Sequence, residues 1–339
     1  MFEFIVIVFL FLSLILYALM GGADFGGGMW DLLATGPRAR EQREAIARAL
    51  GPIWEANHVW LILVVVLLFT AFPPAFAALT TALNIPLTVM LVGIVLRGSA
   101  FIFRKYDSSA ESVQLHWSHI FGAASLLTPF FQGVIVGAAV SGQIHVVNGA
   151  VTSGFFAGWL TPFALACGVF ALVLFAFLAA TYLTVETGGQ PELQNDFRRR
   201  ALGSGFALGP VTLVVYLTSR KGAPDMFHGL DHWWAPLLLL ATSLFAIGAL
   251  LGLWRREFLL ARFAAAGQVA LILVGWSLVQ YPHLVTPDLT FANTAAPEVT
   301  LRLLVFALGA GAVLLLPSLA FLFYLFKGRR TATQDRPVK

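Results

Sequence analysis

The sequence has few charged residues and almost no cysteine. Only 11% of its 339 residues are charged, against about 25% in soluble domains, so a soluble globular protein is excluded. The one cysteine, Cys167, excludes a disulfide scaffold, and its apolar neighbours predict a buried residue rather than a redox group. No nucleotide-binding loop, nucleophile elbow or Cys/His metal cluster occurs. Hydrophobic residues make up 59% of the chain, which predicts an integral membrane protein.

Nine apolar stretches are long enough to cross a bilayer as helices, for which about 20 residues are needed. They lie at about 4–33, 53–72, 75–103, 114–138, 158–186, 199–219, 234–253, 259–281 and 301–326. Only Pro73-Pro74 separates the second stretch from the third, so one bent helix is the alternative there. The sequence predicts an all-α membrane protein with a single polytopic domain over 1–330 and a basic tail over 331–339.

The basic residues predict the orientation of the chain. Of the 21 Lys and Arg residues, all but Arg220, Lys221 and Arg302 fall on one side of the nine-helix arrangement. The positive-inside rule then places the N-terminus outside and the C-terminal tail in the cytoplasm. The net charge of +4 follows this topology and does not indicate nucleic-acid binding. The N-terminus lacks the basic region of a signal peptide, so the first helix is expected to be retained.

One stretch near the start, residues 21–30, reads GGADFGGGMW and places Asp24 at the inner end of the first predicted helix. A carboxylate at membrane depth costs about 2.5–3.5 kcal/mol on insertion scales, which makes it a functional-site hypothesis. Gly22 and Gly26 have the small-xxx-small spacing of a helix-packing seam. Together with Gly27 and Gly28 they predict a surface for close contact with another helix or a partner.

Three further polar side chains, Glu55, His58 and Arg97, are expected near the depth of Asp24. Glu55 and His58 are three residues apart, on one face of the second helix. In a structural interpretation, Asp24 and Arg97 form a buried pair and Glu55 favours a helix N-terminus. In a functional interpretation, the two carboxylates and the imidazole form a proton relay that opens to the cytoplasm.

Two other histidine pairs have spacings that could suggest metal or haem ligation. His116 and His119 are three residues apart, and His228 and His232 are four apart. The first pair lies beside Trp117, where interfacial histidines are the favoured interpretation. Glycine and nearby prolines argue against a regular helix at the second pair, so no metal site is predicted.

Two motifs resemble subunit II of the cytochrome bd-type quinol oxidases. They are Gly22–Met29 (GADFGGGM) and Pro52–Ile62 (PIWEANHVWLI), and the second contains Trp54, Asn57 and Trp60 as further candidates for helix packing or partner contact. The short segments LRGSAF at 96–101 and ATYL at 180–183 agree as well. The resemblance extends over the whole chain in length and helix order.

The resemblance implies two four-helix bundles plus one peripheral helix. It implies a similarly folded subunit I that holds two b-type haems, one d-type haem and the quinol site, while this chain binds no haem. The complex would oxidise quinol and reduce dioxygen to water in the bacterial inner membrane, with protons taken from the cytoplasm through subunit II. The family also admits a structural quinone in this subunit and a small single-helix accessory subunit.

The resemblance carries over residue by residue with some departures. Asp24 and Arg97 match family residues, whereas Glu55 stands where Asp is common and His58 where Gln is found. Ile102 stands where some members have an acid, so the resemblance does not imply a third proton carrier on the third helix. The nearest acid, Asp107, follows in the loop.

A proton-coupled secondary transporter that uses Asp24 and Glu55 is the alternative function. Such proteins have paired interrupted helices at the membrane midplane, which this sequence does not show.

Overall fold

The computed structural model describes residues 1–51, 54–106 and 111–325, and within them nine helices are long and apolar enough to cross a membrane. These helices are α1 (Phe2–Leu32), α3 (Trp54–Ala71), α5 (Asn84–Tyr106), α6 (Glu111–Val140), α7 (Pro162–Glu186), α8 (Pro191–Gly222), α10 (Ala235–Arg255), α11 (Phe258–Gln280) and α13 (Glu298–Phe323). The predicted all-α membrane fold and the helix count are confirmed. The basic tail, 331–339, and Asp107 lie outside the described residues.

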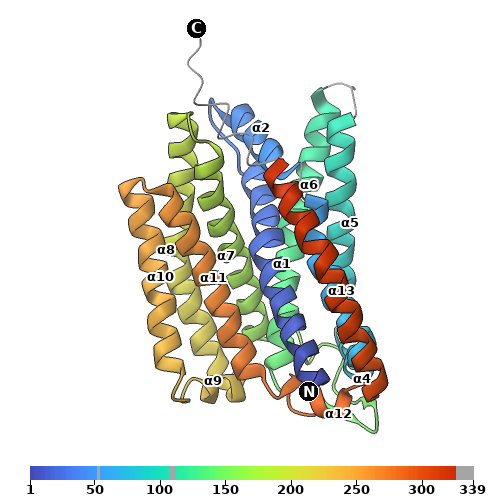
Figure 1. The fold of residues 1–339 in the computed structure, drawn as a ribbon. Helices are drawn as coiled ribbons and strands as arrows, with labels where there is room; N and C mark the ends of the chain where they lie inside the picture. The colour runs from blue at the N-terminus through green and yellow to red at the C-terminus, as the bar shows by residue number, and fades with distance from the viewer. Residues whose placement is uncertain (52–53, 107–110, 326–339) are drawn as a thin grey trace.

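Short elements cover the two ends of this helical assembly. The first end holds α2 (Ala39–Leu50) and the starts of α6 and α8 (Figure 1), and we call it the arginine-rich end because Arg38, Arg43, Arg104 and Arg200 lie there. The opposite end carries the remaining short elements. They are α4 (Pro73–Ala82), α9 (Pro224–Gly229), α12 (Phe291–Thr294) and the hairpins β1 (Val146–Val147) with β2 (Ala150–Val151) and β3 (His283–Val285) with β4 (Leu289–Thr290).

The third predicted helix, 75–103, is not continuous, and that prediction is wrong. The chain forms the short helix α4 and breaks at Leu83, and the membrane-crossing helix α5 begins only at Asn84. Proline explains both starts, because it lacks an N–H and is tolerated only in the first turn of a helix. Pro73 opens α4, and Pro86 lies in the first turn of α5.

Two other boundaries also follow from capping and proline. The fifth predicted helix, 158–186, begins at Pro162, because the Thr161 side chain accepts a hydrogen bond from the backbone N–H of Ala164 and caps the helix there. The sixth, 199–219, extends back to Pro191 at the arginine-rich end, where its first two turns are polar. The helix therefore projects beyond its apolar segment.

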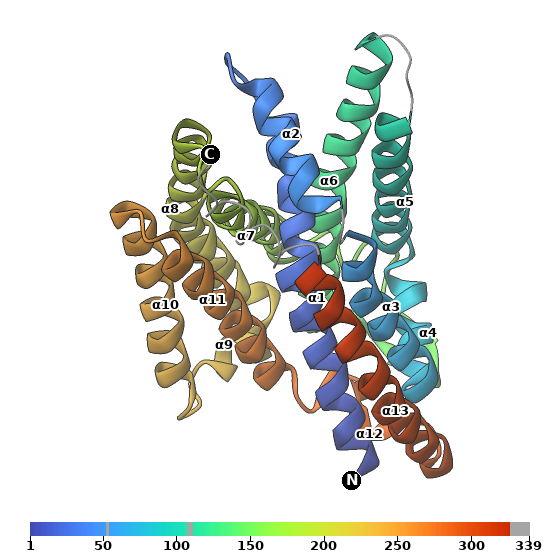
Figure 2. The same ribbon diagram turned by 45° about the horizontal axis from the view of Figure 1, so that its top comes forward.

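Helix α1 occupies the centre of the protein. It packs against α2, α3, α6, α7, α11 and α13, and Figures 1 and 2 show it surrounded by these elements. In contrast, α13 lies at the edge. Only 6% of its most apolar 18-residue segment is buried inside the protein, against 56% for the corresponding segments of α6 and α7. The grouping into two four-helix bundles plus a peripheral helix stays a prediction. The central position of α1 brings Asp24 within reach of several neighbouring helices.

Candidate functional site

Asp24 on α1 is buried and hydrogen-bonded from two other helices. Its side chain is almost fully enclosed, with a residue exposure of 2%. Asn57 on α3 donates from Nδ2 to the Asp24 Oδ2 atom at 2.6 Å. Arg97 on α5 donates from Nη2 to the backbone carbonyl of Asp24 at 3.0 Å. A charged group so deep in a membrane helix is stable only with partners of this kind.

Arg97 is itself enclosed by aromatic rings and a hydroxyl. Its exposure is 2%, and its Nε donates to the Ser125 Oγ on α6 at 3.2 Å. Its guanidinium carbon lies 4.8 Å from the centroid of the Phe25 ring and 5.2 Å from that of Phe121. Such cation–π contacts are strongest where water is excluded. Arg97 therefore places a positive charge beside Asp24 and joins α1, α5 and α6.

His58 lies near the same site in a cage of aromatic side chains. The centroids of Tyr17, Phe25 and Trp54 are 6.0, 5.9 and 6.1 Å from that of the imidazole. Its Nδ1 atom is buried and has no hydrogen-bond partner among the described residues. Phe25 is close to both His58 and Arg97, so the imidazole and the guanidinium share this aromatic wall.

Glu55 does not join these groups. It lies in the first turn of α3, where its side chain is exposed on the surface of the chain. The structure therefore brings three of the four predicted polar residues together, namely Asp24, His58 and Arg97, and turns Glu55 outward.

The residues predicted to mediate packing lie mostly inside the chain. Asn57 and Trp60 are buried, whereas Trp54 is half-buried against Phe101. A β-carbon on Gly22 would lie 2.6 Å from the Phe175 ring of α7, and one on Gly26 would overlap the Phe175 carbonyl. Gly27 faces Leu50 of α2, and Gly28 faces Ser125 of α6. These four glycines of α1 thus allow the close approach of three different helices, α2, α6 and α7.

The amphipathic helix α2, which sequence analysis assigned to a loop, closes the arginine-rich end of α1. Its buried residues, Ala45, Ile46 and Leu50 among them, recur at helical spacing in 38–51, and that pattern could have predicted the helix. Arg38, which precedes it, binds Asp196 through two hydrogen bonds of 2.8 and 2.9 Å. These bonds raise the pKa of Arg38 above its ordinary value, so it stays charged.

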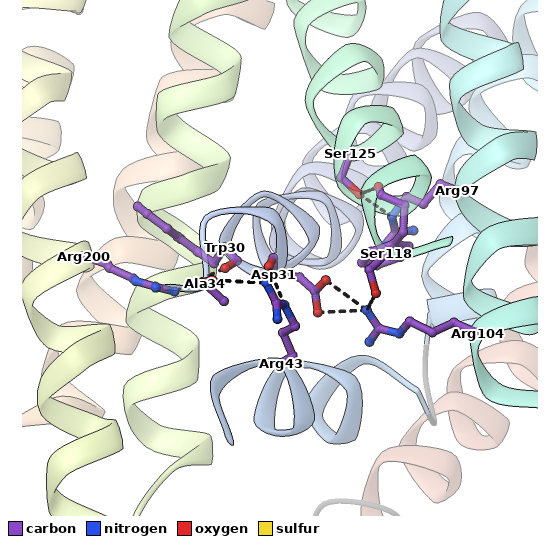
Figure 3. Close-up of polar contacts among 10 residues, drawn as sticks. Trp30, Asp31, Ala34, Arg43, Arg97, Arg104, Ser118, Ser125 and Arg200 are labelled. Carbon is purple, nitrogen blue, oxygen red and sulfur yellow. Dashed lines mark hydrogen bonds and ion pairs between the residues drawn. The ribbon is translucent and has the colours of Figure 1, made fainter. Parts of the chain in front are cut away.

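A buried ion pair that the sequence did not reveal lies two helical turns from Asp24, nearer the arginine-rich end. Asp31 on α1 is fully buried, and Arg104 on α5 donates from Nη1 to both of its carboxylate oxygens at 2.9 Å. Figure 3 shows Arg104 pointing at this carboxylate, while Arg43 and Arg200 reach the backbone around it. The heptad spacing of Asp31 from Asp24 and of Arg104 from Arg97 was the available signal.

The remaining candidates do not form a site in the described part of the chain. No group of three or more His, Cys, Asp or Glu side chains is close enough there to hold a metal ion. His116 and His119 are exposed, and His228 lies 3.5 Å from Asp231 at the surface.

Comparison with protein families gives a match over nearly the whole chain. Residues 2–326 match the family described as cytochrome bd terminal oxidase subunit II. The chain belongs to this family. As a member of the cytochrome bd subunit II family with nine apolar helices among its described residues, it is a multi-pass membrane protein and part of an oxidoreductase complex.

Curated relatives in bacteria agree with the family assignment. A putative cytochrome bd menaquinol oxidase subunit II of Bacillus subtilis is 23% identical over 92% of this chain and 91% of its own length. Cytochrome bd ubiquinol oxidase subunit 2 of the same species is 26% identical over 96% of this chain and 95% of its own length. Cytochrome bd-I ubiquinol oxidase subunit 2 of Escherichia coli is 30% identical over 60% of this chain and 52% of its own length.

A solved structure shares the fold of this subunit. The bd oxidase of Geobacillus thermodenitrificans superposes with a TM-score of 0.77 and 23% identity. The match covers 96% of this chain and 98% of that chain, so the helix order is shared throughout.

The hydrogen bond between Asn57 and Asp24 predicts a loss of stability when it is removed. Replacing Asn57 with Leu leaves a buried carboxylate without this donor, which costs about 1–3 kcal/mol. We expect the complex in detergent to unfold at a lower temperature, measured by tryptophan fluorescence. Asn57→Asp is expected to be worse, because a second carboxylate would lie within 2.6 Å of the first. Wild-type melting of Asn57→Leu would contradict the predicted contribution.

Proposed function

We propose that this chain is the haem-free subunit II of a quinol:oxygen oxidoreductase of the bacterial inner membrane. The observation that carries the proposal is the family match over residues 2–326, together with the quinol oxidase activity in the names of the relatives. The partner is a haem-bearing subunit I that holds two b-type haems, a d-type haem and the quinol site. The complex oxidises quinol and reduces dioxygen to water.

The role of this subunit in the reaction is to conduct protons from the cytoplasm. Asp24 is the carboxylate of the path. Asn57 donates a hydrogen bond to its side chain, and Arg97 binds its backbone carbonyl, which fixes the position of the carboxylate. His58 extends the path, since its buried Nδ1 is available to a water or a proton donor. Glu55, exposed in the first turn of α3, is a further carboxylate of the path.

The arginine-rich end faces the cytoplasm in this proposal, and the N-terminus lies outside. The support is the positive-inside rule applied to four arginines that bind acidic side chains or backbone carbonyls at that end, namely Arg38, Arg43, Arg104 and Arg200. Protons consumed with dioxygen then enter from the cytoplasm, while protons from quinol leave on the other side. Charge is separated across the membrane without a pump.

Two further parts of the complex belong to the proposal. A small accessory subunit with a single helix would bind in the membrane against the exposed helices. A structural quinone would occupy an apolar groove. The described residues form such a groove between α1, α7 and α8. Its volume is about 550 Å³, and its lining includes Trp30, Val173 and Ala207. The proposal assigns no catalytic role to this groove.

A reduced-minus-oxidised optical spectrum tests the assignment of the haems. We expect the isolated chain to be colourless and the complex purified with it to show the bands of b- and d-type haems. Haem bands in the isolated chain would make ligands of His58, His116 or His119 and would contradict the proposal. Absence of haem from both samples would leave the proton-coupled transporter as the better explanation.

A further inference from the structure

A second polar layer on α1, α5 and α6 repeats the arrangement around Asp24. We define the Asp24 layer as Asp24, Arg97 and Ser125, and the Asp31 layer as Asp31, Arg104 and Ser118. Each helix contributes one residue to each layer with a spacing of seven, which is two turns of helix or about 10.5 Å. α6 runs opposite to α1 and α5, and its two serines are accordingly in reverse order.

The two layers contain the same kinds of groups, but Arg104 binds the carboxylate of Asp31, whereas Arg97 binds the backbone carbonyl of Asp24. In the Asp31 layer, Arg104 donates to both Asp31 oxygens at 2.9 Å and contacts the Ser118 hydroxyl at 3.4 Å. In the Asp24 layer, Arg97 donates to the Ser125 hydroxyl at 3.2 Å and to the backbone of Asp24. Each layer thus combines a carboxylate with a guanidinium and a hydroxyl, which are groups that can carry or orient a proton.

Phe121 on α6 separates the two layers. The guanidinium carbon of Arg97 lies 5.2 Å from its ring centroid, and that of Arg104 lies 5.4 Å from it. The ring is 1% exposed. The two carboxylates are therefore too far apart for direct transfer, which needs a heavy-atom distance of about 2.6–3.2 Å, and water must bridge the apolar gap.

Two further arginines bind the backbone around Asp31. Arg43 of α2 donates from Nε to the Asp31 carbonyl at 3.3 Å and from Nη2 to that of Ala34 at 3.2 Å. Arg200 of α8 donates to the carbonyls of Trp30 and Leu33 at 3.3 and 3.2 Å. These bonds satisfy the last carbonyls of α1, whose dipole would otherwise repel a carboxylate.

Arg104 is the side chain that connects Asp31 with the surface. Its side chain is 16% exposed, whereas that of Asp31 is 0% exposed. In Figure 3 it approaches the carboxylate from α5, on the other side from the contacts of Arg43 and Arg200. Rotation of Arg104 toward solvent would open Asp31 to water without moving the backbone, because a long arginine side chain can reach the interface from a buried stem.

We propose that the Asp31 layer is the cytoplasmic entrance of the proton path, with Asp31 as the first proton acceptor and Arg104 as its lid. The proposal rests on the proposed proton path through Asp24. Hydronium from the cytoplasm protonates the Asp31 carboxylate when Arg104 turns away, which leaves water. The neutral acid then releases the proton through bridging water past Phe121 to the carboxylate of Asp24, and Arg104 pairs again with the ionised Asp31.

Proton uptake by the complete complex after a pulse of oxygen tests this proposal. A pH-indicator dye reports the uptake, and the haem bands report electron transfer in the same sample. We expect Asp31→Asn to slow the uptake by about tenfold or more while the electron transfer that precedes uptake keeps its rate. Asp31→Glu keeps a carboxylate and is expected to restore most of the uptake rate, and the double variant described below separates a proton acceptor from a structural ion pair. The solvent isotope effect on turnover should rise in Asp31→Asn.

Asp24→Asn measured in parallel separates this proposal from the proposed function. If Asp24→Asn slows uptake and Asp31→Asn does not, the entrance is refuted and the path through Asp24 stands. If neither variant slows uptake, both are refuted. Because Asp31→Asn leaves Arg104 unpaired, the double variant Asp31→Asn/Arg104→Gln removes both charges together. Wild-type uptake in the double variant would overturn the proposal, and slow uptake in an assembled, haem-replete double variant would support it.

Discussion

Replacing Asp24 with Asn is expected to lower the rate of oxygen reduction by about 100-fold while the complex keeps its haems. The amide has nearly the shape of the carboxylate and can accept the hydrogen bond that Asn57 donates at 2.6 Å. It cannot take up and release a proton near neutral pH. The backbone carbonyl of Asp24 still accepts from Arg97, so α1 and α5 stay joined.

The measurement is quinol-dependent oxygen consumption, normalised to the haem content of the purified complex. Asp24→Glu is the matched control, because it keeps a titratable group on a longer side chain and should retain part of the activity. A loss of haem and of the partner subunit in Asp24→Asn would instead make Asp24 a structural partner of Arg97. Full activity in Asp24→Asn would refute the proton path.

Gly26→Ala is expected to prevent assembly of the complex, although it adds only one methyl group. A β-carbon at Gly26 would overlap the backbone carbonyl of Phe175 on α7 and would lie 2.6 Å from the Ala179 side chain. A backbone carbonyl cannot rotate away as a flexible side chain can. The helices α1 and α7 must therefore separate, which disrupts the buried core around Phe25, Phe175 and Leu178.

The same substitution at Gly203 is the control. Gly203 lies within α8, and no atom lies within 4 Å of the position of its missing β-carbon. Gly203→Ala should leave the yield unchanged or improve it, since alanine favours a helix by about 1 kcal/mol over glycine. Yield in the membrane and elution as an intact complex on size exclusion measure both variants. Wild-type yield of Gly26→Ala would contradict the close approach of α1 and α7.

Periodicity and apolar length predicted the membrane helices because each span is specified locally. A run of about 20 apolar residues is needed in every helix that crosses the bilayer, whatever it packs against. The same argument explains the two elements that were missed. Helix α2 is polar and amphipathic, so it produces no apolar run. The break at Leu83 lies between two apolar segments, so it does not interrupt one.

The site was predicted in part for a similar reason. Asp24 and Arg97 stand out because a charge inside an apolar helix has a cost that sequence alone reveals. Asp31 falls at the end of the first predicted helix, and Arg104 falls in the loop after the third. Charged residues are common at both kinds of position, so these two did not stand out. Burial of Asp31 depends on α2, α5 and α8 closing over the end of α1, which involves residues far apart in the chain.

Composition and local motifs are enough to show that this protein is helical, lies in the membrane and belongs with the cytochrome bd subunit II family. These properties follow from composition, from the spacing of apolar runs and from two motifs that are each contiguous in the chain. Which polar groups meet depends instead on how the helices pack in the tertiary structure. It turned Glu55 outward, enclosed His58 in aromatic rings and paired Asp31 with Arg104. The reason is that the rotation of each helix about its axis is set by packing against its neighbours, and hydropathy along the chain does not contain it.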